Sequence, residues 1–235
     1  MTDPEEIKRG VTVCMFDQYG TVVDMQGGLR EAAAPFLSGK GWKGDPNAFV
    51  TWWRRTHFEN SMIDALLHRE HTPYRAIGEL SVAQVLARAG VAHTEEEVRA
   101  LVAAIERLKP FPEVPAALDR LRTRYRLVVL SNGDPDMLEE AKRHHGVAFE
   151  RAISVAEAGR AFKPHRATYT EAAELLGVRV EEVLFVANHE FDVVGAKAAG
   201  MRAAFIDRRH RPFARWPHRP DLVVPDMAAL ADAIV

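Results

Sequence analysis

Several features that define common protein classes are scarce in this chain. Its 235 residues include a single cysteine, Cys14, which excludes an internal disulfide and a cluster of thiolate metal ligands. No apolar run approaches the roughly 20 residues that a membrane-spanning helix needs, so we expect no membrane partner. The formal net charge of −2 provides no overall attraction to nucleic acid or to anionic lipid. Repeats and low-complexity tracts are also missing.

The sequence does contain enough apolar material for a sizeable core. Apolar residues make up 47% of the chain, and its length suits one large domain or a domain with an insert. The first ten residues, MTDPEEIKRG, are polar and acidic, unlike a secretory signal. We therefore expect a soluble, cytoplasmic protein.

Short and nearly continuous apolar runs predict strands that are buried on both faces of a parallel sheet. The predicted strands are Val11 to Phe16, Arg126 to Ser131, Arg151 to Val155, Glu182 to Ala187, Arg202 to Asp207 and a weaker edge strand, Asp221 to Asp226. Helical stretches lie between most of them and end at Gly146, Gly177 and Gly200. This alternation predicts an α/β fold with an open, Rossmann-like parallel sheet.

Residues 25–108 interrupt the alternation, because no convincing strand occurs there. The segment from Asn47 to Glu70 has long helical character, and Ser81 to Gly90 predicts a second helix. Thr94 and Glu97 form a capping box that opens an amphipathic helix. We therefore predict a core of residues 1–24 and 109–235, with residues 25–108 inserted after the first strand as a helical cap.

Polar side chains follow the predicted strands at the sheet edge where ligands bind in open α/β folds. Asp17 comes directly after the first strand. The polar residues at the other strand ends are Ser131 and Asn132, Lys163, and Asn188, His189 and Asp192. Two helix starts are also expected near this edge, one at Pro135 with Asp134 as its N-cap, and one at Pro164.

In this order, the segments FDQYGT, LSNG, a lysine before proline, and FVANHEFD resemble the four motifs of the haloacid dehalogenase superfamily. The resemblance covers nearly the full chain and implies that Asp17 is a nucleophile. Phosphatases of that superfamily carry a second aspartate where this chain has Tyr19. The run Val186-Ala187-Asn188 also lacks the carboxylates that Mg²⁺ prefers. We therefore expect no metal and no cofactor.

A carboxylate that works without a metal is suited to attack an sp³ carbon that bears a leaving group, forming an ester that water then hydrolyses. The tyrosine form of the first motif resembles the L-2-haloacid dehalogenase branch. The expected reaction converts short-chain (S)-2-haloacids to 2-hydroxy acids, with inversion at C2. The expected partners are thus a small carboxylic acid and a halide, and the resemblance also allows a homodimer.

The resemblance implies roles for the residues around Asp17. Thr21 orients the nucleophile by a hydrogen bond, and the positive charge of Lys163 keeps it ionised. Asp192 holds Lys163 or the hydrolytic water. Tyr169 either lies beside the lysine or is an ordinary helical core tyrosine.

Other residues are predicted to bind the substrate or the halide. The backbone N–H groups of Gln18 and Tyr19, together with Ser131, are expected to bind the substrate carboxylate. In the segment WWRRTHFEN, Arg54 is predicted to receive the halide, with Asn132 beside it, whereas Arg55 is interpreted as part of a solvated helix face. The remaining predicted binding residues are Asn188 and Phe191, the latter on the apolar face of the pocket.

One departure from the family pattern leaves alternatives open. His189 stands where the haloacid branch usually has asparagine. It could activate the water that cleaves the ester, or adapt the site to another α-substituted acid such as azetidine-2-carboxylate, whose ring amine needs a proton to leave. A phosphatase and a non-catalytic binder of a small acid also stay open. The basic segment from Asp207 to Pro220 is interpreted as a solvated loop, not as a nucleic-acid surface.

Overall fold

The computed structural model describes residues 4–67 and 70–235, which form two compact units. The sheet unit comprises the chain up to Val23, Pro110–Asn132 and Val147–Val235. The helical unit comprises Asp24–Lys109 and Gly133–Gly146. Within the described ranges, no helix combines the length and the apolar character that crossing a membrane requires.

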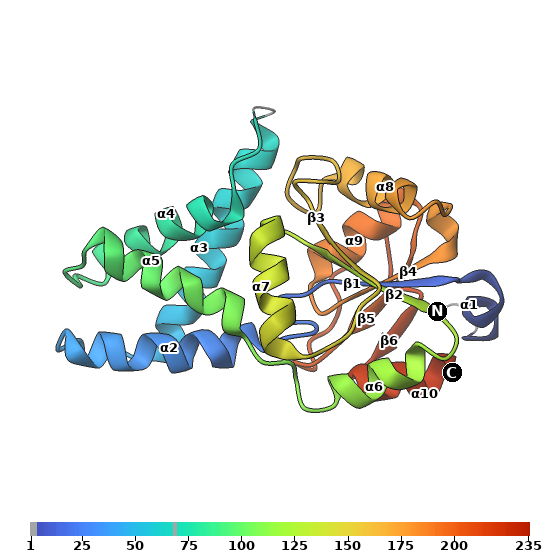
Figure 1. Cartoon of the computed structure of the whole chain (residues 1–235), viewed down its shortest axis with the longest axis horizontal. Coiled ribbons are helices and arrows are strands. Elements are labelled where there is room, and N and C mark those ends of the chain that lie inside the picture. Colours follow the sequence, from blue (N-terminus) through green and yellow to red (C-terminus); the bar gives the residue numbers. More distant parts are fainter. Residues whose placement is uncertain (1–3, 68–69) are drawn as a thin grey trace. The chain divides into compact units, whose positions relative to one another are not determined.

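The sheet unit contains a six-stranded parallel sheet in the order β3-β2-β1-β4-β5-β6 (Figure 1). The strands are β1 (Val13–Phe16), β2 (Arg126–Ser131), β3 (Arg151–Ser154), β4 (Val183–Ala187), β5 (Arg202–Ile206) and β6 (Leu222–Val224). Each predicted strand is present, with bounds that agree to within two residues at either end. The predicted α/β class with a Rossmann-like sheet is confirmed.

The central strand, β1, explains why an apolar run precedes Asp17. Every residue of β1 is fully buried, as expected for a strand with neighbours on both sides and helices on both faces. Phe16 pairs with Val129 of β2 and with Val186 of β4. The order of the strands reverses between β1 and β4, so their carboxyl ends border the crevice where open α/β sheets bind ligands.

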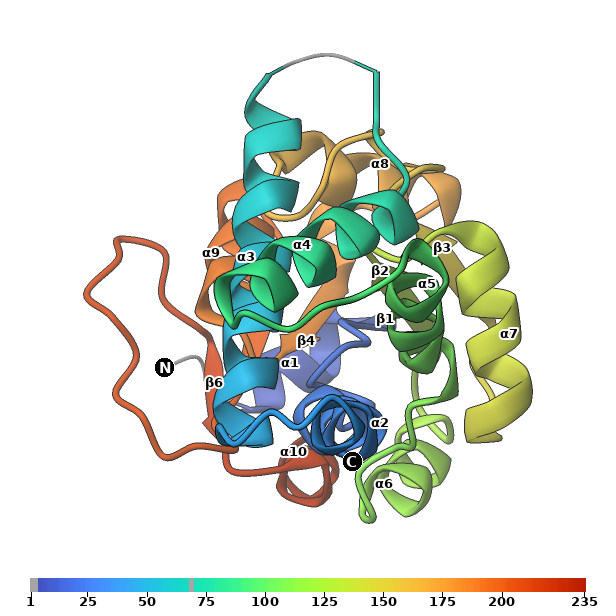
Figure 2. The same ribbon diagram turned by 90° about the vertical axis from the view of Figure 1, so that its left-hand side faces the viewer.

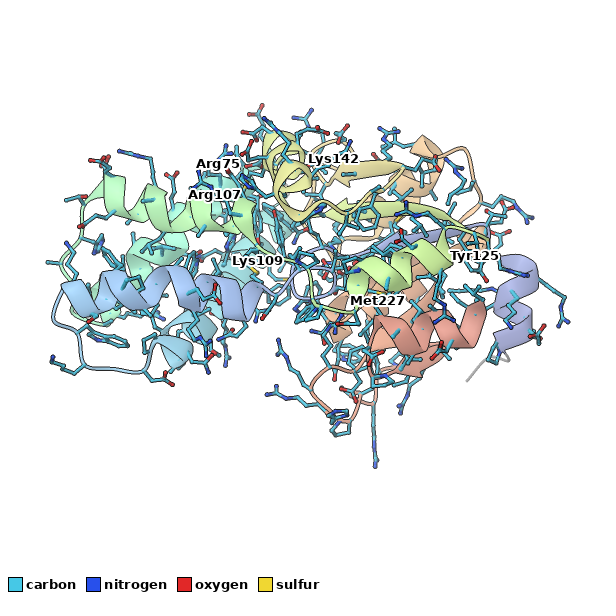
Figure 3. All side chains as sticks on the ribbon, turned by 60° about the horizontal axis from the view of Figure 1, so that its bottom comes forward. Arg75, Arg107, Lys109, Tyr125, Lys142 and Met227 are labelled. Carbon is cyan, nitrogen blue, oxygen red and sulfur yellow. The ribbon has the colours of Figure 1, made fainter. Side chains whose placement is uncertain are left out.

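Helices cover both faces of the sheet. They are α1 (Pro4–Gly10), α6 (Val114–Leu121), α8 (Arg166–Leu175), α9 (Glu190–Ala199) and α10 (Met227–Ile234), with a short 3₁₀ helix, η2 (Val180–Glu182). Helices α8 and α9 lie on one side, and α6 and α10 lie on the other (Figure 1). Figure 3 labels Tyr125 and also Met227, the buried first residue of α10. The hydroxyl of Tyr125 donates to the carbonyl of Ile234 at 2.8 Å. This bond ties the start of β2 to the end of α10.

The helical unit contains α2 (Met25–Gly39), α3 (Pro46–Leu66), α4 (Tyr74–Arg88), α5 (Glu95–Ala103), η1 (Ala104–Arg107) and α7 (Pro135–His145). Helix α3 packs against α2 and α4, and α5 packs against α4 (Figure 2). The capping box is confirmed, because Thr94 and Glu97 exchange hydrogen bonds of 2.9 and 3.2 Å at the start of α5. The helix expected over residues 47–70 ends at Leu66, and residues 68–69 lie outside the described ranges.

Asp134 is the N-cap residue of α7, as predicted, but the expected cap by its side chain is wrong. It precedes α7, which begins at Pro135 as expected, but its carboxylate does not cap that helix. Instead it accepts hydrogen bonds from the backbone N–H groups of Tyr74 and Arg75, at 2.8 and 3.0 Å. The residue before α4 is Pro73, whose side chain has no acceptor, so Asp134 supplies the cap that α4 lacks. The Arg75 side chain, labelled in Figure 3, also pairs with Asp136 at 2.8 Å.

The predicted start of α8 at Pro164 is also wrong, because the helix begins at Arg166. The backbone N–H of His165 donates to the carbonyl of Phe162 at 3.0 Å. This turn occupies residues 162–165, so helical geometry starts only after it. The turn places Lys163 between β3 and α8.

The contact between α8 and α9 depends on Gly195. A Cβ atom at Gly195 would lie 2.6 Å from the Cβ of Pro164 and 2.7 Å from the hydroxyl oxygen of Tyr169. Both distances are shorter than real carbon contacts allow. The absence of a side chain at this position therefore lets α9 approach Tyr169.

We predict that Gly195→Ala lowers the free energy of unfolding by about 1–3 kcal/mol, the range for overpacked cores, although alanine is the better helix former. Gly39→Ala in α2 is the matched control, since a Cβ there meets no atom within 4 Å. The control should be neutral or slightly stabilising. Urea unfolding curves measure both, and a Gly195→Ala protein as stable as the wild type would contradict the packing.

Candidate active site

Asp17 lies at the centre of a buried cluster of charged and polar side chains. Its backbone N–H donates to the carbonyl of Val186 at 3.0 Å, which fixes the residue at the border of β1 and β4. Its Oδ1 accepts a hydrogen bond from the ammonium group of Lys163 at 2.8 Å. Its Oδ2 accepts one from the Thr21 hydroxyl at 2.7 Å, and Nδ1 of His189 lies 3.3 Å from the same oxygen.

Lys163 is the buried cation of this cluster. Its side chain is 1% exposed, and its Nζ lies 2.8 Å from Asp17 Oδ1, 2.7 Å from Asp192 Oδ2 and 3.1 Å from the carbonyl oxygen of Leu130. These contacts use the three hydrogens of the ammonium group. One cation therefore joins two carboxylates and the end of β2.

Tyr169 completes the partners of Asp192. Its hydroxyl donates to Asp192 Oδ1 at 2.5 Å, so both oxygens of that carboxylate accept hydrogen bonds. Burial, and next the charge of Asp192, raise the pKa of Tyr169 well above its usual value. The phenol therefore keeps its proton and stays a donor. Asp192, in the first turn of α9, thus holds Lys163 in place and is itself held by Tyr169 on α8.

Opposing effects set the charges in the cluster. Burial alone would raise the pKa of Asp17, but the charge of Lys163 and the hydrogen bond from His189 outweigh it and hold that pKa below the usual range. Burial would lower the pKa of Lys163, but the two carboxylates outweigh it and raise the value. Burial is also the largest cause of the raised pKa of Asp192. At neutral pH, Asp17 is thus an ionised carboxylate next to a charged lysine.

Thr21 is oriented by Asn188. The backbone N–H of Asn188 donates to the Thr21 hydroxyl oxygen at 2.9 Å, which directs the hydroxyl hydrogen toward Asp17. The side-chain amide of Asn188 donates to the carbonyl of Gly20, also at 2.9 Å. Asn188 thus braces the loop that carries Thr21, and its predicted binding of substrate or halide stays a prediction.

His189 is the N-cap residue of α9 and follows β4. Its ring packs on Phe191, with centroids 5.4 Å apart and an angle of 32° between the ring planes. The His189 side chain is 21% exposed, in contrast to the buried Lys163 and Thr21. Among these three donors to Asp17, the histidine is therefore the one that solvent reaches.

Four other predicted site residues of the sheet unit are buried or partly buried near strand ends. Gln18 and Tyr19 follow Asp17 and are buried, and Ser131 ends β2 and is fully buried. Asn132 is partly buried and accepts a hydrogen bond through its Oδ1 from the backbone N–H of Lys163 at 2.9 Å. This bond joins the end of β2 to the segment that carries the lysine.

Arg54 belongs to the helical unit, on α3. Its Nη1 donates to Oε1 of Gln26 at 3.0 Å, and Gln26 on α2 in turn donates to the side-chain oxygen of Asn47 at 2.8 Å. Arg55, one residue further, pairs with Glu59 at 2.9 Å and is exposed, as predicted. The two neighbouring arginines thus have different surroundings, and only Arg54 is braced from a second helix.

Sequence reasoning missed Arg208. Its segment was interpreted as a solvated loop, yet the Arg208 side chain is only 12% exposed. It donates to the carbonyl of Thr21 at 3.1 Å, pairs with Glu113 at 2.6 Å, and its guanidinium lies 3.8 Å from the ring centroid of Phe111. Arg208 therefore holds the loop that contains Asp17 and Thr21 through the carbonyl of Thr21. An arginine within a basic run gives no local signal of such a role.

A metal ion beside Asp17 would need carboxylate ligands, and those that lie there already bond to a lysine. The carboxylate next to Asp17 is that of Asp192, and the Lys163 ammonium already bonds to both. Among residues 4–67 and 70–235, no group of three or more His, Cys, Asp or Glu is arranged to hold a metal ion.

Comparisons with known proteins identify the relatives of this chain. The model of the haloacid dehalogenase-like hydrolase family matches residues 11–200. Haloacetate dehalogenase H-2 of Moraxella sp. (strain B) is 32% identical over 222 residues, which are 93% of this chain and 96% of that protein. An (S)-2-haloacid dehalogenase of Xanthobacter autotrophicus is 34% identical over 201 residues, which are 84% of this chain and 76% of that protein.

A solved structure of L-2-haloacid dehalogenase from Xanthobacter autotrophicus, with chloropropionic acid covalently bound, has the same fold. It superposes with a TM-score of 0.82 and 28% sequence identity, and the match covers 95% of this chain and 98% of that chain.

We predict that Lys163→Met lowers the free energy of unfolding by about 3–5 kcal/mol at neutral pH, because it leaves two buried carboxylates without their cation. Lys197→Met is the matched control. Lys197 pairs with Asp221 at 2.8 Å, but its side chain is 23% exposed and lies outside the cluster. The control should cost about 1 kcal/mol or less. Equal losses in the two variants would contradict the role of Lys163.

We also predict how the stability lost in Lys163→Met changes with pH. In the wild type, the pKa of Asp17 is lower in the folded than in the unfolded state, so ionised Asp17 stabilises the fold above about pH 4. This stabilisation is lost as the pH falls through the pKa of Asp17 in the folded state. The pKa of Lys163 is higher in the folded than in the unfolded state, so charged Lys163 stabilises the fold below about pH 10. This stabilisation is lost as the pH rises through the pKa of Lys163 in the folded state. Without the lysine, the pKa values of both carboxylates rise. The deficit of Lys163→Met should therefore be larger at pH 8 than at pH 5.

Proposed function

This chain belongs to the haloacid dehalogenase-like hydrolase family, and we propose that it hydrolyses short-chain (S)-2-haloacids to 2-hydroxy acids through an aspartyl ester. The observation that carries the proposal is the buried, ionised Asp17, paired with Lys163 and followed two residues later by Tyr19. The names of the relatives from Moraxella and Xanthobacter support the same reaction.

In the first step, Asp17 attacks C2 of the haloacid. A carboxylate oxygen approaches C2 from the side opposite the halogen, a C–O bond forms, and the halide leaves with the electron pair. Back-side attack inverts C2. A halide is a weak base, so it leaves without a proton, and no acid is needed at the position of Tyr19. Lys163 keeps Asp17 ionised until the attack.

In the second step, water attacks Cγ of the Asp17 ester. The negative charge of the tetrahedral intermediate develops on the oxygen that stays with Asp17. Lys163 donates to Oδ1 at 2.8 Å and is positioned to stabilise that charge in a site from which bulk water is excluded. The 2-hydroxy acid leaves with the other oxygen, and Asp17 becomes a carboxylate again.

The reaction as proposed uses no metal ion. The ammonium group of Lys163 bonds to both Asp17 and Asp192 and supplies the positive charge next to the two carboxylates. Tyr169 and Asp192 hold the lysine, and Asn188 orients Thr21. These contacts support positioning roles for groups that do not themselves touch the substrate.

The proposal also assigns binding roles to single residues of each unit. The backbone N–H groups of Gln18 and Tyr19, with Ser131, bind the substrate carboxylate, and Phe191 contacts its apolar side. Arg54, held by Gln26, has the role of receiving the halide, and Asn132 keeps its predicted halide-binding role. Residues 25–108 then act as a cap. Assembly as a homodimer and location in the cytoplasm stay predictions.

We predict that Asp17→Asn and Asp17→Ala each lower halide release from (S)-2-chloropropionate by about 10⁴-fold or more, as expected when a covalent nucleophile is removed. Release is measured with a halide electrode, and thermal unfolding confirms that the variants fold. Near wild-type turnover in either variant would remove Asp17 from its role. A chelator should leave the wild type unchanged, whereas Mg²⁺-dependent hydrolysis of p-nitrophenyl phosphate would favour a phosphatase.

We predict that Arg54→Ala lowers dehalogenation by about 10²–10³-fold, the effect of losing one donor to a developing anion. Arg55→Ala is the matched control, since that side chain is exposed and pairs only on the surface with Glu59. It should retain wild-type kinetics. If the two variants have equal rates, Arg54 does not bind the halide.

A further inference from the structure

The two oxygens of Asp17 have different surroundings. Oδ1 faces Lys163, whose ammonium group is fixed by Asp192 and by the carbonyl of Leu130 in the buried interior. Oδ2 faces the Thr21 hydroxyl and Nδ1 of His189, the partly exposed side chain. Oδ2 therefore lies beside the partly exposed His189, which suits this oxygen to the attack on C2.

The contact between His189 and Oδ2 defines where the ring carries a proton. Ionised Asp17 can only accept a hydrogen bond, so Nδ1 of His189, 3.3 Å from Oδ2, must be the donor. The other ring nitrogen, Nε2, lies on the opposite edge of the ring. The nitrogen that faces the reacting carboxyl group is thus a proton donor.

We propose that His189 is the general acid of ester breakdown, an inference that rests on the function proposed above. After alkylation, Oδ2 is the ester oxygen that is bonded to C2. Water forms a bond to Cγ, the Cγ–Oδ2 bond breaks, and its electron pair stays on Oδ2. The imidazolium form of His189 transfers the Nδ1 proton to Oδ2 and is left as neutral imidazole, so the product leaves as an alcohol instead of a strongly basic alkoxide.

The protons balance over the step. The attacking water brings two hydrogens. One returns to His189 and restores its imidazolium form, and the other passes to solvent as Asp17 regains an ionised carboxylate. Lys163, on Oδ1, stabilises the oxyanion in the same intermediate and gives up no proton.

Thr21 also donates to Oδ2, at 2.7 Å, but it is a poor candidate for the acid. An alcohol is a far weaker acid than an imidazolium. The Thr21 oxygen accepts a hydrogen bond from the backbone N–H of Asn188, a group that cannot resupply a lost proton. Thr21 is therefore a positioning residue.

The same geometry bears on the substrate class. In a back-side displacement, the leaving group departs on the side of C2 opposite Oδ2. A donor in contact with Oδ2 is on the wrong side to protonate it. His189 thus fits a leaving group that needs no proton, such as a halide, and does not assist the ring amine of azetidine-2-carboxylate.

The decisive variant is His189→Gln, which keeps an N–H donor and removes the acid. In rapid-quench experiments with (S)-2-chloropropionate, the first turnover should release about one halide per enzyme within a few-fold of the wild-type rate. Steady-state turnover should fall by about 10²–10³-fold, and intact-protein mass spectrometry should show the accumulated ester.

Chemical rescue separates an acid from a base. In His189→Ala, added imidazole should accelerate decay of the ester, and the imidazole-dependent rate should be greater at pH 6 than at pH 8, because the protonated form is the active one. Rescue that increases with pH would assign His189 to activation of water instead and overturn the inference.

The remaining outcomes are also distinct. Turnover of His189→Gln at the wild-type rate without accumulated ester would overturn the inference alone, as would a first halide release that slows by the same factor as turnover. A wild-type protein that releases no halide would overturn the proposed function, and this inference with it.

Discussion

The site depends on one ammonium group between two buried carboxylates. Lys163 bonds to Asp17, to Asp192 and to the carbonyl of Leu130, and so joins the ends of β1 and β2 to α9. Removing one member of such a group leaves charge in the interior without compensation, which costs more than the contact itself contributes. The close packing of α9 on Tyr169, permitted by Gly195, serves this arrangement because Tyr169 holds the second carboxylate.

The cation also determines which chemistry the site favours. It keeps Asp17 ionised in a buried position where burial alone would favour the protonated acid. In the proposed mechanism, it also supplies positive charge at Oδ1, where charge develops as the ester breaks down. The opposite oxygen is left to Thr21 and His189. In the proposed mechanism, the negative charge develops on Oδ1, beside Lys163, and Oδ2 bonds to carbon.

Much of the fold and of the cluster was predictable from local sequence. Continuous apolar runs identified the strands, and the residues just after them identified Asp17, Ser131 and Asn188 at the sheet edge. Features set by distant partners were not predictable. Asp134 has the local pattern of a cap for α7, but it caps α4 because Pro73 cannot. Arg208 looks like part of a solvated basic run, and its burial depends on Phe111 and Glu113 in a remote connector.

The central claim is that a carboxylate oxygen of Asp17 bonds to C2 of the substrate. A single turnover with excess enzyme in H₂¹⁸O tests it most directly, with the product and the peptide containing Asp17 analysed by mass spectrometry. The account predicts that the first product molecule carries the unlabelled oxygen of Asp17 and that one ¹⁸O enters the Asp17 carboxylate. Product labelled in that first turnover, with Asp17 unlabelled, would show that water attacks C2 directly and would contradict the account.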